Sequence, residues 1–390
     1  MEHRNKRTFI ITQFYSFVRY FNYILFAFSV DDAMESVGKS KRNRKPSALE
    51  RLNNVAIFWF WFTMLAVYYA GVVEVLPALY TRYASLLWLN RIFCTFVFVQ
   101  MAMNWACVRY VRSHFRPEEH REYIESHAEE IAADGCEINL NNLIRNPDEE
   151  GCTIPRRSLK CPDGAVPAGF ASNTLYVIAL PPEEAGRGHS GESRHVVYPY
   201  WSWKPCVICH VVRPPRAHHC PICNVCVLKR DHHCFFTGSC VGLRNQRHFV
   251  VFSFWSAVIT SYCLVHSIGY LNRHFLVRDS VADLVLPVAV FRAMLGYVSY
   301  ADVVLVALLY SVTWFLMTSL GFLYEQCRII SRGITSFELD NNMKVVNTCS
   351  LSQNISAVFG DKWWLNFIFP ACRLFPEMEN GVTWRHVKIR

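Results

Sequence analysis

The sequence predicts an all-helical membrane protein with four transmembrane helices and a loop-rich, cysteine-rich domain between the second and third. Three observations support this. Of the 390 residues, 52% are hydrophobic and 15% aromatic, which exceeds what an ordinary soluble protein carries. The apolar residues gather in runs that can cross a hydrocarbon core about 30 Å thick. Finally, seven of the sixteen cysteines fall between Cys206 and Cys240.

The four predicted spans form two pairs. Residues 55–79 and 84–108 should make a helical hairpin (55–108) around a tight connection at 80–83. Residues 249–271 and 303–323 should be the third and fourth spans of a segment at 249–324 that includes an extracytosolic loop. Between them, 281–298 is apolar but contains Asp283, Pro287 and Arg292, so we expect it to lie along the far interface.

Two charged residues interrupt the first hairpin. Glu74 and Arg91 stand at similar distances from the connection, so antiparallel helices would place them at matching depth. Because an unpaired charge is unfavourable in lipid, the sequence suggests an ion pair between them. The alternative is that both side chains reach out to the outer interface.

Polar segments flank the hairpin. Residues 1–54 should form a cytosolic N-terminal segment, in which the apolar run 9–30 lies between basic clusters and favours an interfacial or re-entrant helix over a span. Residues 109–200 read as a partly disordered polar linker. Cys136, Cys152 and Cys161 lack paired ligand spacing there and are expected to be ordinary thiols.

The basic residues predict orientation. Thirteen Lys and Arg residues lie near the span ends on one side, against four on the other (Arg82, Arg273, Arg278 and Arg292). The positive-inside rule therefore puts both termini, the cysteine-rich stretch and a C-terminal tail at 325–390 in the cytosol. The net charge of +9 is spread over segments that flank the spans, which argues against nucleic acid as a partner.

The cysteine-rich stretch has the ligand spacing of zinc sites, in which a tight turn aims both sulfurs of a C-x2-C pair at one ion. Such spacing and free thiols both require a reducing compartment. More candidate ligands are present than two four-ligand sites can hold: Cys206, Cys209, His210, His218, His219, Cys220, Cys223, Cys226, His232, His233, Cys234 and Cys240. The surplus includes a cysteine that follows two histidines and an aspartate, in the tetrad Asp231–Cys234, and a thiol beside a carboxylate-oriented imidazole is the arrangement that activates a nucleophile.

At these residues the chain resembles the DHHC protein S-acyltransferases (palmitoyltransferases). The resemblance runs through Arg213–Cys220, the Asp-His-His-Cys tetrad, Cys240-Val-Gly and Asn245. Two weaker likenesses follow the fourth span. Thr335-Ser-Phe-Glu338 is similar to the family's Thr-Thr-x-Glu motif, and 354–360 with Trp363 and Trp364 is similar to its C-terminal motif, which docks on the membrane domain. The alternative for the latter is an amphipathic tail helix.

The resemblance implies a zinc-binding catalytic domain at 201–248 with two structural Zn²⁺ ions. One ion would take Cys206, Cys209, His219 and Cys226; the other would take Cys220, Cys223, His233 and Cys240. That leaves Cys234 as nucleophile and His232 as base, oriented by Asp231. The chain departs from the family at Phe235-Phe236, where Pro-Trp is usual, and at Gly238-Ser239, where Asn is usual before the last ligand. We expect Phe236 to contact the acyl chain as the family's Trp would.

The implied reaction moves a long-chain acyl group, palmitoyl, from acyl-CoA to cysteines of membrane proteins at the cytosolic face. Arg213, Arg216, Lys229 and Arg230 are expected to hold CoA phosphates, the alternative being a basic face beside anionic lipid. The expected location is a multi-pass endomembrane position, Golgi or endoplasmic reticulum. The runner-up functions are a non-catalytic zinc-stabilised membrane adaptor or a plain zinc scaffold with a buried Cys234. The ligand order does not suit a RING-type ligase.

Overall fold

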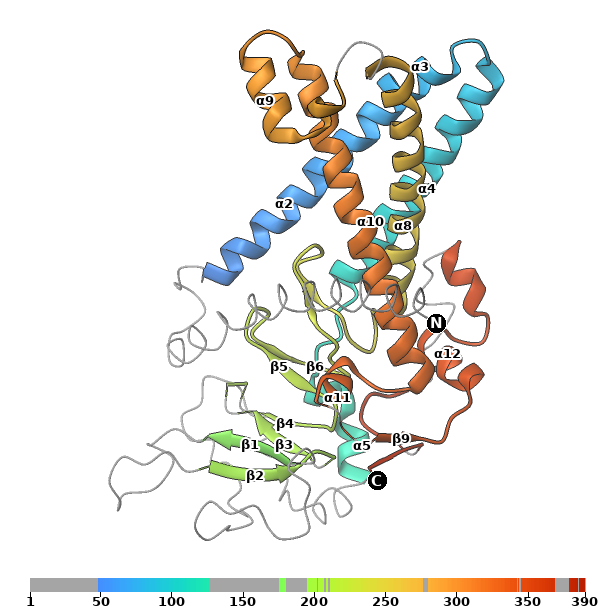
Figure 1. The fold of residues 1–390 in the computed structure, drawn as a ribbon. Coiled ribbons are helices and arrows are strands. Elements are labelled where there is room, and N and C mark those ends of the chain that lie inside the picture. The colour runs from blue at the N-terminus through green and yellow to red at the C-terminus, as the bar shows by residue number, and fades with distance from the viewer. Residues whose placement is uncertain are drawn as a thin grey trace, which may run out of the picture.

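In the computed structural model, a bundle of long helices stands on a smaller globular part built from hairpins and the C-terminal tail (Figure 1). The structure describes residues 48–126, 175–179, 195–201, 203–206, 208–209, 211–275, 280–341, 343, 345–368, 379–384 and 386–389. Within those residues, four helices are long and apolar enough to cross a membrane: Ala48–Tyr80, Ala84–Tyr110, Gln246–Arg273 and Tyr300–Arg332.

The first span is a continuous helix with a change of pitch. It runs as α2 (Ala48–Tyr69), a π-helical turn (Ala70–Val75) and α3 (Leu76–Tyr80), and α4 (Ala84–Tyr110) returns beside it. The π-turn frees carbonyl groups, and Arg91 Nη2 donates to the carbonyl oxygen of Val72 at 3.3 Å. The expected ion pair between Glu74 and Arg91 does not form: Arg91 contacts the loosened backbone and the ring of Trp88, while Glu74 is exposed.

The third and fourth spans are α8 (Gln246–Tyr270), followed by a π-turn (Leu271–Phe275), and α10 (Tyr300–Arg332). A 3₁₀ turn (Val281–Leu284) and α9 (Leu286–Met294) fold back at the far end of the bundle (Figure 1). The fully buried Asp283 pairs there with Arg292 at 2.8 Å, and Ser280 completes a capping box. This internal neutralisation fits a segment that lies at the far interface, and α9 is too short to span.

Short antiparallel hairpins form the globular part. They pair β1 (Leu175–Ala179) with β2 (His195–Pro199), β3 (Lys204–Cys206) with β4 (Val211–Arg213), β5 (His218–Cys220) with β6 (Val225–Val227), and β7 (His233–Cys234) with β8 (Ser239–Cys240). After α4, a 3₁₀ turn (Pro117–His120) and α5 (Arg121–Ser126) bring Phe115 and Ile124 into one apolar cluster with Trp203 and Leu228. Part of the expected polar linker is thus structured.

The C-terminal tail returns to the bundle. It contains α11 (Ser336–Asp340), β9 (Val345–Asn347), α12 (Leu351–Phe359), a 3₁₀ turn (Trp363–Phe367) and β10 (Val387–Ile389), which pairs with β9. Phe359 packs with Ile329 of α10 and Val250 of α8. The side chain of Asn354 donates to the carbonyl oxygen of Ser331 at 3.1 Å. The structure therefore supports the interpretation that the motif at 354–360 docks on the membrane domain, and not the alternative of an amphipathic tail helix.

The expected fold class is confirmed: four spans with a cysteine-rich, loop-rich domain between the second and third. The spans are longer than predicted, and at about 1.5 Å per residue the 33 residues of α10 exceed the membrane core. Its surplus turns reach the zinc domain. The predicted helix at 9–30 lies outside the described residues, as do Cys136, Cys152, Cys161 and His210.

Candidate active site and two metal centres

The first candidate metal centre lies across two hairpins. Cys206 and Cys209 come from the β3–β4 hairpin, whereas His219 and Cys226 face each other across the β5–β6 ladder. Their ligand atoms all lie within 4.8 Å of one another, with His219 Nδ1 3.7 Å from the Cys206 sulfur and 3.2 Å from the Cys209 sulfur.

The second centre repeats this plan one hairpin further along the chain. Cys220 and Cys223 come from the β5–β6 turn, and His233 pairs with Cys240 across β7–β8. His233 Nδ1 lies 3.3–3.7 Å from the three sulfurs, and the sulfurs of Cys223 and Cys240 are 3.7 Å apart. The other ring nitrogen, Nε2, donates to Asn53 Oδ1 of α2 at 3.1 Å, which orients Nδ1 toward the thiols.

These distances fit tetrahedral zinc. With Zn–S near 2.3 Å and Zn–N near 2.0 Å, tetrahedral angles require about 3.8 Å between sulfurs and about 3.5 Å from sulfur to nitrogen. Three cysteines and one histidine per site are a donor set that zinc prefers, and neither set leaves an open position. Each site would therefore be structural. Arg230 lies beside the thiols of the second centre, where its charge offsets the thiolates.

Cys234 and His232 belong to neither cluster, so the expected surplus is real. Cys234 is buried in the apolar cluster of the helix bundle, with Phe60, Phe249 and Phe315. His232 Nδ1 donates to Asp231 Oδ2 at 3.2 Å, and the ring packs on Phe249 and Phe322. Its other nitrogen, Nε2, is buried and has no hydrogen-bond partner within the described residues, which leaves it available to the thiol.

The surroundings separate charge between the two residues. Burial alone raises the pKa of the Cys234 thiol, but the adjacent imidazolium of His232 outweighs it, so the pKa lies below the ordinary thiol value. Burial by itself lowers the pKa of His232, but the charge and hydrogen bond of Asp231 outweigh burial and raise the pKa to about 10. The imidazolium of His232 therefore favours the thiolate of Cys234, which is the reactive form of a cysteine nucleophile.

The comparisons with known proteins agree on the family. A sequence model described as DHHC palmitoyltransferase matches residues 201–343. The chain is 32% identical over 208 residues to palmitoyltransferase ZDHHC22 of Mus musculus, covering 52% of this chain and 73% of that protein. The protein of that name from Danio rerio is 34% identical over 132 residues, covering 33% of this chain and 48% of that protein. The chain belongs to the DHHC palmitoyltransferase family. The expected protein S-acyltransferase function is thereby confirmed at the level of the family.

The turn after the DHHC tetrad is held by α4. Trp105 Nε1 donates to the carbonyl oxygen of Phe236 at 2.9 Å, and Arg109 Nη1 donates to those of Thr237 at 3.1 Å and Gly238 at 2.6 Å. Gly238 has a φ of +63°, and a Cβ there would lie 2.2 Å from Arg109 Nη1. The departure from the DHHC family pattern at this position is thus matched by a close approach of Arg109.

The ring of Phe236 lies in the apolar cluster of the bundle, and its contact with an acyl chain stays a prediction. Its ring lies 5.9 Å from that of Phe315 and 6.3 Å from that of Phe60, in the same cluster as Cys234. The motif after the fourth span also meets the DHHC domain. Arg216 makes a bidentate ion pair with Glu338 at 2.7 and 2.9 Å, and both side chains are fully buried.

The four cations expected to hold CoA phosphates have other contacts. Arg216 pairs with Glu338, Lys229 pairs with Glu379 at 2.7 Å, and Arg213 is buried and donates to the carbonyl oxygen of Ala217. Arg230 faces the second metal centre. CoA binding by these residues stays a prediction, and their contacts give each a structural role.

Sequence reasoning missed four residues that support the site: Asn53, Trp105, Arg109 and Gln326. Gln326 Nε2 donates to Asp231 Oδ2 at 2.6 Å from α10. All four lie on helices that are far away in the sequence from the site residues they contact. Gln326 is 95 residues from Asp231, and each of the other three is at least 128 residues from its partner. The only signal in the sequence is a polar or amphipathic side chain near the end of an apolar helix.

Proposed function

We propose that this chain transfers a long-chain acyl group, palmitoyl, from acyl-CoA to cysteines of proteins at the cytosolic membrane face, through an acyl-Cys234 intermediate. The observation that carries the proposal is the position of Cys234 next to the Asp231-bound His232, outside both metal centres and with the thiol inside the apolar cluster of the bundle. The lowered pKa of the thiol agrees with this placement. A thiol in that position suits acyl-CoA, whose reactive carbonyl carbon joins an apolar acyl chain to a water-soluble carrier.

In the first transfer, the Cys234 thiolate attacks the thioester carbonyl carbon of acyl-CoA. The new bond to Cys234 sulfur forms as the bond to the CoA sulfur breaks, and the imidazolium of His232 gives its proton to the departing CoA thiolate. In the second transfer, neutral His232 takes the proton of an acceptor cysteine, whose thiolate attacks the new thioester. The thiolate of Cys234 is then restored beside an imidazolium.

The remaining site residues have supporting roles in this proposal. Asp231 holds His232 with Nδ1–H toward its carboxylate, which aims Nε2 at the thiol. Phe236 lines the acyl chain next to the thioester. The two sets of three cysteines and one histidine would each hold a structural Zn²⁺, and bound zinc would fasten the hairpins on which Asp231–Cys234 is placed.

The zinc domain is proposed to face the cytosol of an endomembrane, Golgi or endoplasmic reticulum. The eight cysteine and histidine residues of the two centres support this, as does the reactive pair of Cys234 and His232, because thiolates persist in a reducing compartment. Its acceptors would be membrane proteins that carry cysteines close to the bilayer surface.

The test is direct labelling. Purified protein incubated with an alkyne-tagged palmitoyl-CoA should acquire a label that neutral hydroxylamine removes, because hydroxylamine cleaves thioesters. Cys234→Ser should abolish both this label and transfer to an acceptor cysteine, since a serine hydroxyl is far less ionised than a thiol near neutral pH. Labelling of that variant at the parent level would exclude Cys234 as the nucleophile. The adaptor alternative predicts no thioester label in either protein.

A further inference from the structure

We propose that Gln326 of α10 is a positioning residue for the reactive pair, and that Gln246 of α8 fixes its orientation. This inference rests on the proposed function, because it assigns a role in forming the acyl-Cys234 intermediate. It starts from a chain of hydrogen bonds that crosses three elements. Gln246 Nε2 donates to Gln326 Oε1 at 3.1 Å, Gln326 Nε2 donates to Asp231 Oδ2 at 2.6 Å, and Asp231 Oδ2 accepts from His232 Nδ1 at 3.2 Å.

The direction of the Gln326 amide follows from the charges it contacts. If the amide were turned over, its oxygen would lie 2.6 Å from a carboxylate oxygen, and two acceptors would repel each other. The nitrogen must therefore face Asp231. The amide oxygen then faces Gln246, whose Nε2–H₂ group is the donor that this orientation requires. Gln246 thus selects the useful orientation of its neighbour.

Asp231 depends on this donor. The residue is 9% exposed, and its Oδ1 has no hydrogen-bond partner within the described residues, so Oδ2 accepts the hydrogen bonds from both His232 and Gln326. A buried carboxylate is held in place by the donors that it accepts from. The Gln326 amide supplies the second donor to Oδ2, and this contact holds the carboxylate where it accepts the Nδ1–H of His232.

Gln326 is placed for this role by the length of α10. The side chain is 2% exposed and sits in the cytosolic turns of that helix, beyond the apolar stretch. A polar side chain buried so deeply is unfavourable without partners, and both amide groups have one. The next turn carries Ile329 and Ile330, which pack on α8 and α12 and hold the helix in register.

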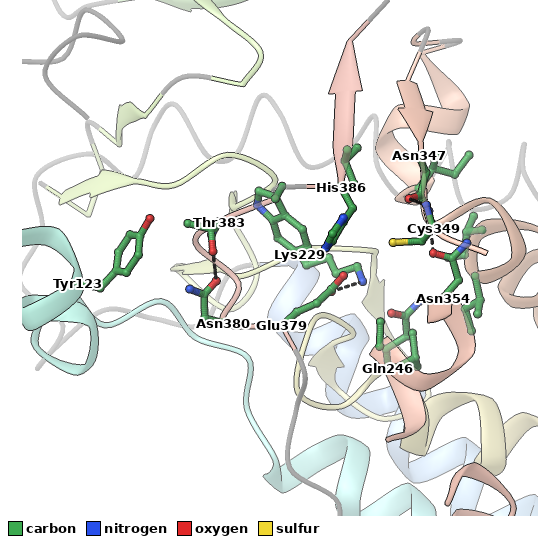
Figure 2. A pocket seen from close by; sticks show the side chains of 18 residues that line it. Tyr123, Lys229, Gln246, Asn347, Cys349, Asn354, Glu379, Asn380, Thr383 and His386 are labelled. Carbon is green, nitrogen blue, oxygen red and sulfur yellow. Dashed lines mark hydrogen bonds and ion pairs between the residues drawn. The ribbon is translucent and has the colours of Figure 1, made fainter. Parts of the chain in front are cut away.

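The chain of hydrogen bonds from Gln246 through Gln326 and Asp231 to His232 is called the relay below. Its outer end, at Gln246, is less enclosed. Gln246 lines a cavity of about 370 Å³ together with Lys229, Glu379 and His386 (Figure 2). Water that enters this cavity could replace the donor of Gln246, whereas neither Gln326 nor Asp231 is among the residues that line it. We therefore expect loss of Gln246 to be the milder defect.

The experiment measures acyl-enzyme formation and the pH dependence of Cys234 alkylation in four purified full-length proteins: the parent, Gln326→Leu, Gln246→Leu and the control Gln100→Leu. Gln100 is also a buried glutamine on a span, but its amide donates to the carbonyl oxygen of Ile368 and not to the relay. Gln326→Leu should form acyl-enzyme roughly ten- to a hundredfold more slowly, with KM for acyl-CoA unchanged. Its alkylation midpoint should move to higher pH, because a weaker Asp231–His232 pair stabilises the thiolate less.

A second variant keeps the test independent of packing. Gln326→Glu has nearly the same shape, but it donates to Asp231 only while the new carboxyl is protonated. Its deficit should therefore shrink as the pH falls, a trend that the leucine variant should lack. Gln246→Leu should fall between Gln326→Leu and the parent.

The outcomes separate this inference from the proposed function. If Cys234→Ser abolishes the label but Gln326→Leu matches Gln100→Leu in rate and in alkylation midpoint, the positioning role is wrong and the proposed function stands. If Cys234→Ser keeps the label, the proposed function fails first. Equal zinc content in all variants would show that the differences arise at the relay and not from lost folding.

Discussion

At the scale of single residues, the reactivity of Cys234 depends on its neighbour and not on exposure. The thiol is 2% exposed, and burial by itself would raise its pKa. The imidazolium of His232, held by Asp231, reverses that effect. One side chain therefore decides whether this cysteine is an inert core residue or a nucleophile.

The first prediction concerns this pair. In the parent, the midpoint of Cys234 alkylation by iodoacetamide should lie below the ordinary thiol value, because the pKa is lowered. In His232→Ala the midpoint should rise, since burial is then opposed only by the hydrogen bonds of Thr237, and acyl-enzyme formation should fall by about 10²–10⁴. Alkylation at Cys234 is followed by mass spectrometry of its peptide. An unchanged midpoint would show that His232 does not stabilise the thiolate.

The second prediction distinguishes the adjacent histidines. His233→Ala removes a ligand whose nitrogen lies 3.3–3.7 Å from three sulfurs, so zinc should fall from about two ions per chain to about one and the protein should lose stability. His232→Ala should keep both ions. Metal analysis of the purified variants provides the measurement, and zinc loss from the His232 variant alone would mean that the two roles are exchanged.

At the scale of elements, the turn between β7 and β8 links Cys234, the proposed nucleophile, to α4. Trp105 and Arg109 bind three consecutive carbonyl groups of that turn, from Phe236 to Gly238. The turn is therefore positioned by a transmembrane helix as well as by the second metal centre.

The third prediction tests the close approach at this turn. Gly238→Ala should cost at least about 1–2 kcal/mol, because the backbone is left-handed at φ +63° and the new methyl group would displace Arg109. The control is Gly321→Ala in α10, where a Cβ meets nothing within 4 Å and helix propensity should improve stability slightly. Thermal unfolding of both variants in detergent is the measurement. Equal midpoints would show that the turn adapts freely.

The fourth prediction concerns Phe236. Phe236→Ala should weaken acyl-enzyme formation while zinc is retained, because the wall beside the thioester is lost. The packing loss should be below the 3–5 kcal/mol of a fully buried ring, since this side chain is only partly buried. Phe236→Trp should be tolerated. Autoacylation of the alanine variant at the parent rate would mean that the transmembrane helices alone hold the chain.

At the scale of the whole molecule, two parts with different sources of stability meet at the active site. The helix bundle is held by an apolar core that contains Cys234 itself, whereas the hairpins of the zinc domain have strands of only two or three residues around the two metal centres. Such short strands cannot persist by pairing alone. Asn53 of α2 binds His233, so the bundle and the second centre also support each other.

The fifth prediction follows from this division. A strong chelator should abolish acyl-enzyme formation and expose the region around 203–243 to limited proteolysis, while far-ultraviolet circular dichroism retains most of the helical signal. Returning zinc should restore activity if the bundle has stayed folded. Full activity after verified metal removal would show that the hairpins hold the reactive tetrad without zinc.

The spans, the zinc-binding stretch and the surplus tetrad Asp231–Cys234 could be predicted from the sequence, because these signals are local: apolar run lengths, C-x2-C spacing and four contiguous residues. The division of the ligands into two sets followed from the resemblance to the family. The surroundings of the tetrad became visible only in the tertiary structure. Gln326, Arg109 and Asn53 reach it from helices far away in the chain, and helix register, not sequence spacing, chooses such partners. The same reason explains the error at Glu74 and Arg91, where a π-turn changed the register that matching depth had assumed.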